Sequence, residues 1–284
     1  MNEIKNKKFA EERALYNLKE TRVISCNFEG ALDGESALKE TRNIIIDSCF
    51  FALRYPLWHS QKFEIINSHF NEFSRAPLWY SINGKINKCD INVIKALREC
   101  SDILIQDSNI KSSEFGWKCN EISISNSNIE GEYDFLDSKN IKINNVNFKG
   151  KYSFQYIDNL IIEDSIIDTK DAFWHSNNVV VKNSIIKGEY LAWYSKNVEL
   201  INCKIIGTQP FCYCENLRII DCEMIDTDLA FEYSSVYATI KGSIKSIKNP
   251  RSGYIEVDSV DEIINENSIN ELSCDIKVRN KLLY

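Results

Sequence analysis

The amino-acid sequence predicts an all-β fold, a single-stranded parallel β-helix of about twelve coils, on two observations. The first is a six-residue block that starts with an apolar residue and usually has Asp or Asn third, Ser or Cys fourth and Ile or Phe last. From Ile86 to Ile219 the start of this block advances by 19 residues each time. The second is a period of two in the apolar positions, with Asn, Asp, Ser and Gly between them, which is typical of short strands and turns. A repeat this short fits one coil, because stacked coils satisfy backbone groups that one coil leaves unpaired.

The stretch from Asp171 to Gly188 shows one complete repeat. Within it, Val179 to Ile186 is the predicted strand, and Ser184 marks a tight interior corner where most coils have Ser or Cys. Most of the ten cysteines therefore have a simple explanation as small, buried members of such ladders. Cys212 and Cys214 form the single close pair, without a second pair or His at ligand spacing. We expect no metal and no cofactor.

The second block of each repeat places two columns of side chains side by side. One column is mostly polar or aromatic, and its charged members lead us to expect that it faces outward. It consists of His59, Tyr80, Glu99, Lys118, Asp137, Tyr156, His175, Tyr194, Tyr213 and Glu232. The neighbouring column contains Arg98 and all five tryptophans. Strict alternation places this column inward, whereas a kink in each coil would expose both columns, and the sequence leaves the choice open.

The repeat sets the expected domain limits. Residues 1–11 are predicted to form an N-terminal cap, residues 12–258 the β-helix, and residues 259–284 a C-terminal cap or tail, because the register fades after Ser243. The net charge of −7 and the lack of an extended basic stripe argue against nucleic acid as a partner. Residues 1–10 are polar and basic, without the apolar run of a secretory signal or membrane anchor, so we expect a cytoplasmic protein and no membrane partner.

Two functional hypotheses follow from the polar column. In the first, the protein is a polysaccharide lyase or hydrolase. Glu99 and Asp137 lie two coils apart, about 10 Å by strand spacing, compatible with the carboxyl separation of an inverting glycosidase. Lys118 lies between them and is placed to hold an anionic sugar or to stabilise developing charge, and either His175 or Tyr156 is placed to move protons. The expected substrate-binding residues are His59, Tyr80, Arg98, Trp117, Tyr156, Trp174, Tyr194 and Tyr213.

In the second hypothesis the protein is a non-catalytic solenoid. The charged and aromatic residues then coat an outer sheet, with Glu99, Lys118 and Asp137 paired across neighbouring coils. Such a surface would bind an oligosaccharide, an acidic sugar, a protein partner or a second copy of the chain. The sequence does not decide between an enzyme and a binding protein.

Several blocks of the sequence resemble an uncharacterised bacterial family within the pectin-lyase-like superfamily of right-handed β-helices. The resemblance covers nearly the whole chain and implies right-handed coiling, but it supplies no activity. Other superfamily members cleave acidic polysaccharides. The clustered Asp pairs of their hydrolase branch are missing from this sequence, and Arg98, Glu99, Lys118 and Asp137 are the one grouping comparable to their lyase branch. The resembling blocks include Arg54-Tyr55-Pro56-Leu57-Trp58-His59, Arg75-Ala76-Pro77-Leu78-Trp79-Tyr80-Ser81 and Glu114-Phe115-Gly116-Trp117-Lys118-Cys119.

Overall fold

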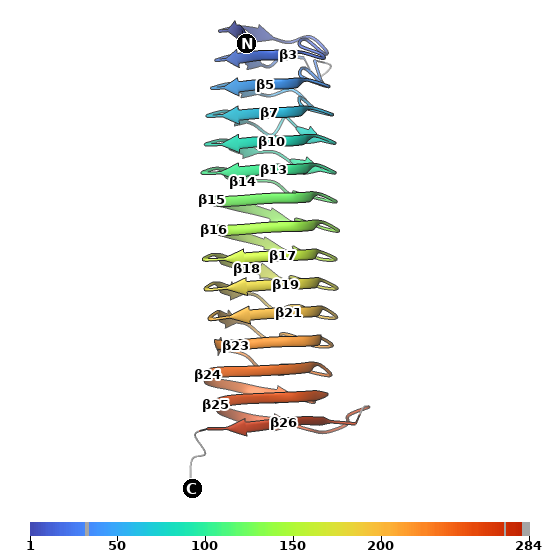
Figure 1. The fold of residues 1–284 in the computed structure, drawn as a ribbon, viewed down its shortest axis with the longest axis vertical. Helices are drawn as coiled ribbons and strands as arrows, with labels where there is room; N and C mark the ends of the chain where they lie inside the picture. The colour runs from blue at the N-terminus through green and yellow to red at the C-terminus, as the bar shows by residue number, and fades with distance from the viewer. Residues whose placement is uncertain (32–33, 270, 280–284) are drawn as a thin grey trace. The chain divides into compact units, whose positions relative to one another are not determined.

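The structure is a computed structural model that describes residues 1–31, 34–269 and 271–279. The described residues form β-strands joined by turns and contain no helix (Figure 1). The chain divides into two compact units, Met1–Asn147 and Phe148–Tyr284, which are described separately. Each unit is a stack of parallel strands, so the predicted β-solenoid fold is confirmed.

Each coil contributes one long strand and, in most coils, one short strand. The strands that begin in the first unit are β1 (Asn2–Lys5), β2 (Lys8–Phe9), β3 (Lys19–Ile24), β4 (Asn27–Phe28), β5 (Arg42–Asp47), β6 (Phe50–Phe51), β7 (Gln61–Ile66), β8 (His69–Phe70), β9 (Leu78–Trp79), β10 (Ile82–Asn87), β11 (Asp90–Asn92), β12 (Leu97–Arg98), β13 (Ser101–Gln106), β14 (Asn109–Lys111), β15 (Asn120–Glu132) and β16 (Lys139–Lys151). The strands of the second unit are β17 (Asp158–Glu163), β18 (Ile166–Lys170), β19 (Asn177–Lys182), β20 (Ile185–Lys187), β21 (Lys196–Ile201), β22 (Lys204–Ile206), β23 (Glu215–Ile225), β24 (Ser235–Lys248), β25 (Ser252–Ile264) and β26 (Ser273–Val278).

Neighbouring coils pair in the register that the repeat predicts. In the first unit Ile86 lies opposite Ile105, and in the second unit Val181 lies opposite Leu200; each step is the predicted repeat length. Strands also occur in both segments expected to be caps. β1 pairs with β3 and β26 pairs with β25, each in parallel. These pairings do not distinguish a cap from a further coil, so the positions of the caps stay a prediction.

The interior is filled by columns of like side chains. In the first unit Phe28 stacks on Phe51 with ring centroids 4.7 Å apart, and Phe51 stacks on Phe70 at 4.4 Å. In the second unit Val179 and Val181 of β19 are buried. Because equivalent residues lie one strand spacing apart, one apolar residue per coil produces a continuous apolar column.

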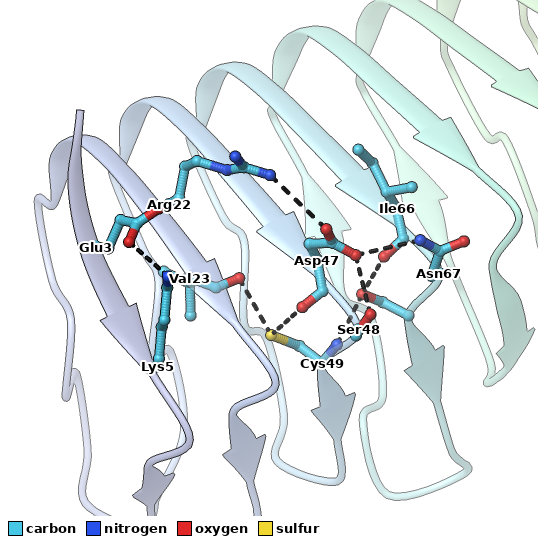
Figure 2. Close-up of polar contacts among 10 residues, drawn as sticks. Glu3, Lys5, Arg22, Val23, Asp47, Ser48, Cys49, Ile66 and Asn67 are labelled. Carbon is cyan, nitrogen blue, oxygen red and sulfur yellow. Dashed lines mark hydrogen bonds and ion pairs between the residues drawn. The ribbon is translucent and has the colours of Figure 1, made fainter.

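Figure 2 shows how the Ser/Cys ladder forms the interior corners. The Cys49 thiol is directed at the carbonyl oxygens of Val23 and Asp47, both 3.4 Å away. The Cys49 N–H donates to the Ser68 hydroxyl at 3.1 Å, and that hydroxyl donates to the Ile66 carbonyl at 2.8 Å. Cys49 and Ser68 thus make equivalent contacts at this corner, each to the carbonyl oxygen two residues earlier in the chain. Burial raises the pKa of Cys49 to about 12, which supports a structural role for this thiol.

Among the described residues, no helix has the length and apolar character needed to cross a membrane.

Candidate functional site

The structure contains the kink that the sequence left open. The polar column lies at left-handed backbone positions, with φ of 57° at His59, 50° at Glu99 and 54° at His175. This conformation turns one side chain outward between two inward ones: Leu57 and Ser60 are fully buried, and His59 between them is exposed. The outward direction expected for the polar column is therefore correct.

The tryptophan column is half-buried and has a structural role. Each indole N–H donates to a backbone carbonyl at the corner of the next coil. Trp58 donates to Ala76 at 2.9 Å, and Trp79 donates to Lys95 at 3.0 Å. Of the residues predicted to bind substrate, Trp117 and Trp174 make the same bond, to the carbonyls of Tyr133 and Tyr190. Arg98 lies between two indoles, 5.0 Å from the Trp79 ring and 5.3 Å from the Trp117 ring, so its guanidinium takes part in cation–π contacts.

The four predicted catalytic residues are not all in one unit. Glu99, Lys118 and Asp137 lie on successive coils of the first unit and are exposed, whereas His175 belongs to the second unit. Glu99 lies 3.9 Å from Arg98, but Lys118 forms no ion pair with Glu99 or Asp137 in the described structure. The cross-coil charge pairing considered as an alternative is thus not formed. The catalytic roles of these residues stay a prediction. Their exposure does not favour those roles, because general acid–base sites commonly use burial to shift the pKa of the catalytic groups.

The second unit carries a continuous stack of aromatic side chains in the polar column. Tyr156 stacks on His175 at 5.0 Å, His175 on Tyr194 at 5.1 Å, and Tyr194 on Tyr213 at 4.7 Å. These rings are nearly parallel, with interplanar angles of 7–8°. Their faces therefore pack against one another, and the exposed part of each ring is an edge. The column therefore presents a row of hydroxyl and imidazole groups rather than open ring faces.

The last member of this column differs from the sequence assignment. Tyr233, not Glu232, continues the column, since its ring contacts Tyr213 at 5.7 Å. The Cys214 N–H donates to Ser234 across 20 residues rather than 19, so this coil contains one extra residue. Glu232 falls in the tryptophan column instead, where it is half-buried and pairs with Lys248 at 2.9 Å.

A ladder of asparagines follows the aromatic column, three residues further along each coil. Asn159, Asn178, Asn197 and Asn216 all have φ between 53° and 59°, the left-handed conformation that asparagine adopts at low cost. Asn178 donates to Asp158 at 3.0 Å and Asn197 donates to Asn178 at 3.1 Å. Asn216 donates to Asn197 at 2.9 Å. Asn178 and Asn216 thus each use one amide N–H in the ladder and keep a second for another partner.

The asparagine ladder borders a shallow groove of about 460 Å³ in the second unit. Its floor includes Ile161, which is 38% exposed, and Val180 opposite it on the next coil. Further along, Glu199 and Arg218 form an ion pair at 3.1 Å. The groove is lined by Asn159, Ile161, Asn178, Val180, Asn197, Val198, Glu199, Asn216 and Arg218. Sequence reasoning treated these asparagines as turn residues alone; their constant offset from an aromatic residue was the missed signal.

A second concavity, of about 340 Å³, lies in the first unit. Its lining includes His59, one of the predicted binding residues, together with Glu40 and Arg42. Across the part of the chain that the structure describes, no three His, Cys, Asp or Glu side chains gather as ligands of one metal ion.

Comparisons with known proteins identify a family. Among solved structures, the chain is similar to the surface protein and adhesin PfbA of Streptococcus pneumoniae, with 8% identity, a TM-score of 0.47, and coverage of 97% of this chain and 92% of that one. It is also similar to the tailspike protein of E. coli bacteriophage HK620, with 8% identity, a TM-score of 0.45, and coverage of 93% of this chain and 60% of that one. The A-module of the mannuronan C-5 epimerase AlgE4 of Azotobacter vinelandii has 11% identity, a TM-score of 0.31, and coverage of 84% and 89%. At such low identity and TM-score, these likenesses carry no functional argument.

No curated protein matches the chain. The family model described as "Protein of unknown function (DUF3737)" matches residues 2–277. The match spans nearly the whole chain and confirms the resemblance to an uncharacterised β-helix family. The chain therefore belongs to the DUF3737 family.

Proposed function

We propose that the protein is a carbohydrate-binding β-solenoid and that the groove of the second unit holds an extended glycan chain. One observation carries this proposal: an outward aromatic residue is followed three residues later by an outward asparagine on four consecutive coils. The pairs are Tyr156 and Asn159, His175 and Asn178, Tyr194 and Asn197, and Tyr213 and Asn216. Equivalent groups recur about every 4.8 Å, so a polymer with a short repeat meets the same pair of groups on each coil.

The chemistry of these groups suits a sugar chain. Tyrosine hydroxyls and the free amide N–H groups of Asn178 and Asn216 donate to sugar oxygens, and the same hydroxyls accept from sugar hydroxyls. Ile161 and Val180 provide an apolar floor for the C–H surface of a pyranose ring. Pockets that bind small polar molecules commonly combine an apolar lining with a few placed polar groups.

The charges of the groove favour a neutral glycan. Glu199 and Arg218 are the two charged residues of its lining, and they pair with each other at 3.1 Å. The groove therefore offers no excess positive charge to an acidic polymer. Neutral polysaccharides should bind more tightly than uronate polymers at low salt.

A glycan array with the full chain, followed by affinity electrophoresis in the best neutral polysaccharide, tests the proposal. Tyr194→Phe removes one hydroxyl and Asn178→Ala removes one amide, and each should weaken binding about tenfold. Asn128→Ala is the matched control, because Asn128 donates to Asn109 at 2.8 Å in an asparagine ladder of the first unit. Undiminished binding in both the Tyr194 and the Asn178 variant, equal loss in the control, or the absence of any array signal would each rule the proposal out.

Three finer predictions go with this proposal. A cytoplasmic location, self-association and polysaccharide cleavage each stay a prediction. Carbohydrate binding at the groove requires none of them.

A further inference from the structure

The concavity of the first unit differs in chemistry from the groove. Its lining is almost wholly polar and consists of Asn17, Glu40, Thr41, Arg42, His59 and Gln61. The backbone N–H groups of Arg42 and Gln61 donate to the carbonyls of Leu18 and Thr41, both at 2.9 Å. Because these backbone N–H groups already donate within the protein, a ligand in the concavity would be bound by side chains.

Four of these side chains have hydrogen-bonding capacity that the protein does not use. Within the described residues, the side chains of Asn17, Arg42 and Gln61 form no hydrogen bond or ion pair, and the His59 ring has only stacking on Tyr80, at 4.9 Å. Several arginines and lysines of the same unit pair with an acid on a neighbouring coil, for example Arg54 with Glu35 and Lys95 with Glu114, both at 3.1 Å. The Arg42 guanidinium lines a polar concavity without such a pair, so it is available to a ligand.

The charge of the concavity fits a singly charged anion. Arg42 is the one cation of the lining, and Lys19, which lies in register with it on the preceding coil but outside the lining, adds a second positive charge beside it. Within the described residues Lys19 has no ion pair. Against these two cations stands Glu40, whose Oε2 accepts the Tyr16 hydroxyl at 2.6 Å. The remaining Glu40 oxygen is left as a hydrogen-bond acceptor. One net positive charge favours a monoanion over a dianion.

We propose that this concavity binds a hydroxylated monocarboxylate. Arg42 takes the carboxylate through two parallel N–H bonds, the arrangement for which guanidinium is suited. Asn17, Gln61 and His59 contact the ligand hydroxyls, and the free Glu40 oxygen accepts one of them. The volume of about 340 Å³ lies within the range of small-molecule sites. This site belongs to the first unit and does not depend on glycan binding in the second.

The test is calorimetric titration of the full chain with gluconate, which carries both a carboxylate and hydroxyls. Acetate supplies the carboxylate alone, glucose the hydroxyls alone, and inorganic phosphate a more highly charged anion. Saturable binding of gluconate, at least about tenfold tighter than that of the other three probes, is the expected result. Equal affinity for gluconate and acetate, tighter binding of phosphate, or no gluconate binding would overturn the assignment.

Variants of Arg42 distinguish specific binding in the concavity from general attraction of anions to surface arginines. Arg42→Gln should weaken gluconate binding about tenfold or more, and Arg42→Lys should keep the charge yet recover only part of the affinity. Arg75→Gln is the matched control, since Arg75 is an exposed arginine of the same unit outside the concavity. Equal loss in the Arg42 and Arg75 variants would refute the site. Arg42 is exposed, so unchanged circular dichroism should confirm that each variant is folded.

Discussion

A buried carboxyl group in the first unit makes the stability of the protein depend on pH. Asp134 is fully buried; its Oδ1 accepts the Phe115 N–H at 2.9 Å, and its Oδ2 has no hydrogen-bond partner. Burial holds the pKa of Asp134 well above its ordinary value, and the nearby charge of Glu132 adds to the increase, whereas the Phe115 N–H opposes it. The folded protein therefore keeps Asp134 protonated at a pH where the unfolded chain is ionised.

The sign of the pH effect follows from proton linkage. Below the unfolded pKa, near 3.9, Asp134 is neutral in both states and has no ionisation cost. As the pH rises towards the higher folded pKa, the unfolded state gains stability by ionising, so the free energy of unfolding falls. The loss is about 1.4 kcal/mol for each pH unit in this window, and the cost stays constant above the folded pKa.

Asp134→Asn removes this titration. An asparagine keeps an acceptor for the Phe115 N–H and has no group that ionises. We expect the variant to be more stable than the wild type at pH 7, with a difference that shrinks by about 1.4 kcal/mol per pH unit below the folded pKa. Asp134→Ala is the control, because it leaves the Phe115 N–H unpaired and should cost about 1–3 kcal/mol relative to Asp134→Asn.

Urea denaturation between pH 4 and pH 8, followed by circular dichroism, measures these differences through the transition midpoints. The reasoning is refuted if the midpoints of the wild type and Asp134→Asn differ by the same amount at every pH. It is also refuted if Asp134→Asn is less stable than the wild type at pH 7, since the carboxylate would then have a favourable partner.

Four further predictions follow from the structure. Trp174→Phe removes the indole bond to the Tyr190 carbonyl and should lower the free energy of unfolding by about 1 kcal/mol in urea denaturation, an expectation that an unchanged midpoint would contradict. Gly131→Ala places a methyl group 2.3 Å from both the Ser112 oxygen and Asp134 Oδ2 and should cost about 1–3 kcal/mol, whereas wild-type stability would show that the corner can relax. Nine cysteines are buried and Cys274 is half-buried, so a disulfide reagent at pH 8 should reach Cys274 well before the other nine. Simultaneous reaction of all thiols in the native protein would show an open interior. If Glu99 and Asp137 catalyse polysaccharide cleavage, Glu99→Gln and Asp137→Asn should each reduce turnover about 100-fold or more, and unchanged turnover would remove them from the mechanism.

The sequence by itself determined the coil, its repeat and most of its register. Strand and turn patterns are local, and stacking repeats them at one spacing, so Val181 opposite Leu200 was predictable from the repeat alone. The same logic predicted the small interior corners. The repeat assigned Glu232 to the polar column, and this prediction was wrong because that coil contains one extra residue, which places Tyr233 in the column instead. A shift of one residue leaves a similar local pattern in the sequence.

The tertiary structure decided which way side chains point and what surrounds them. Alternation alone does not give the outward turn at His59, since it arises from a positive φ between two buried neighbours. Asp134 was missed although its equivalents on the neighbouring coils, Phe115 and Ser153, are buried as well, because a carboxyl group is expected at the surface by its residue type. The groove and the Arg42 concavity were missed because each is formed by residues on several coils, and a concavity exists only when the coils are stacked.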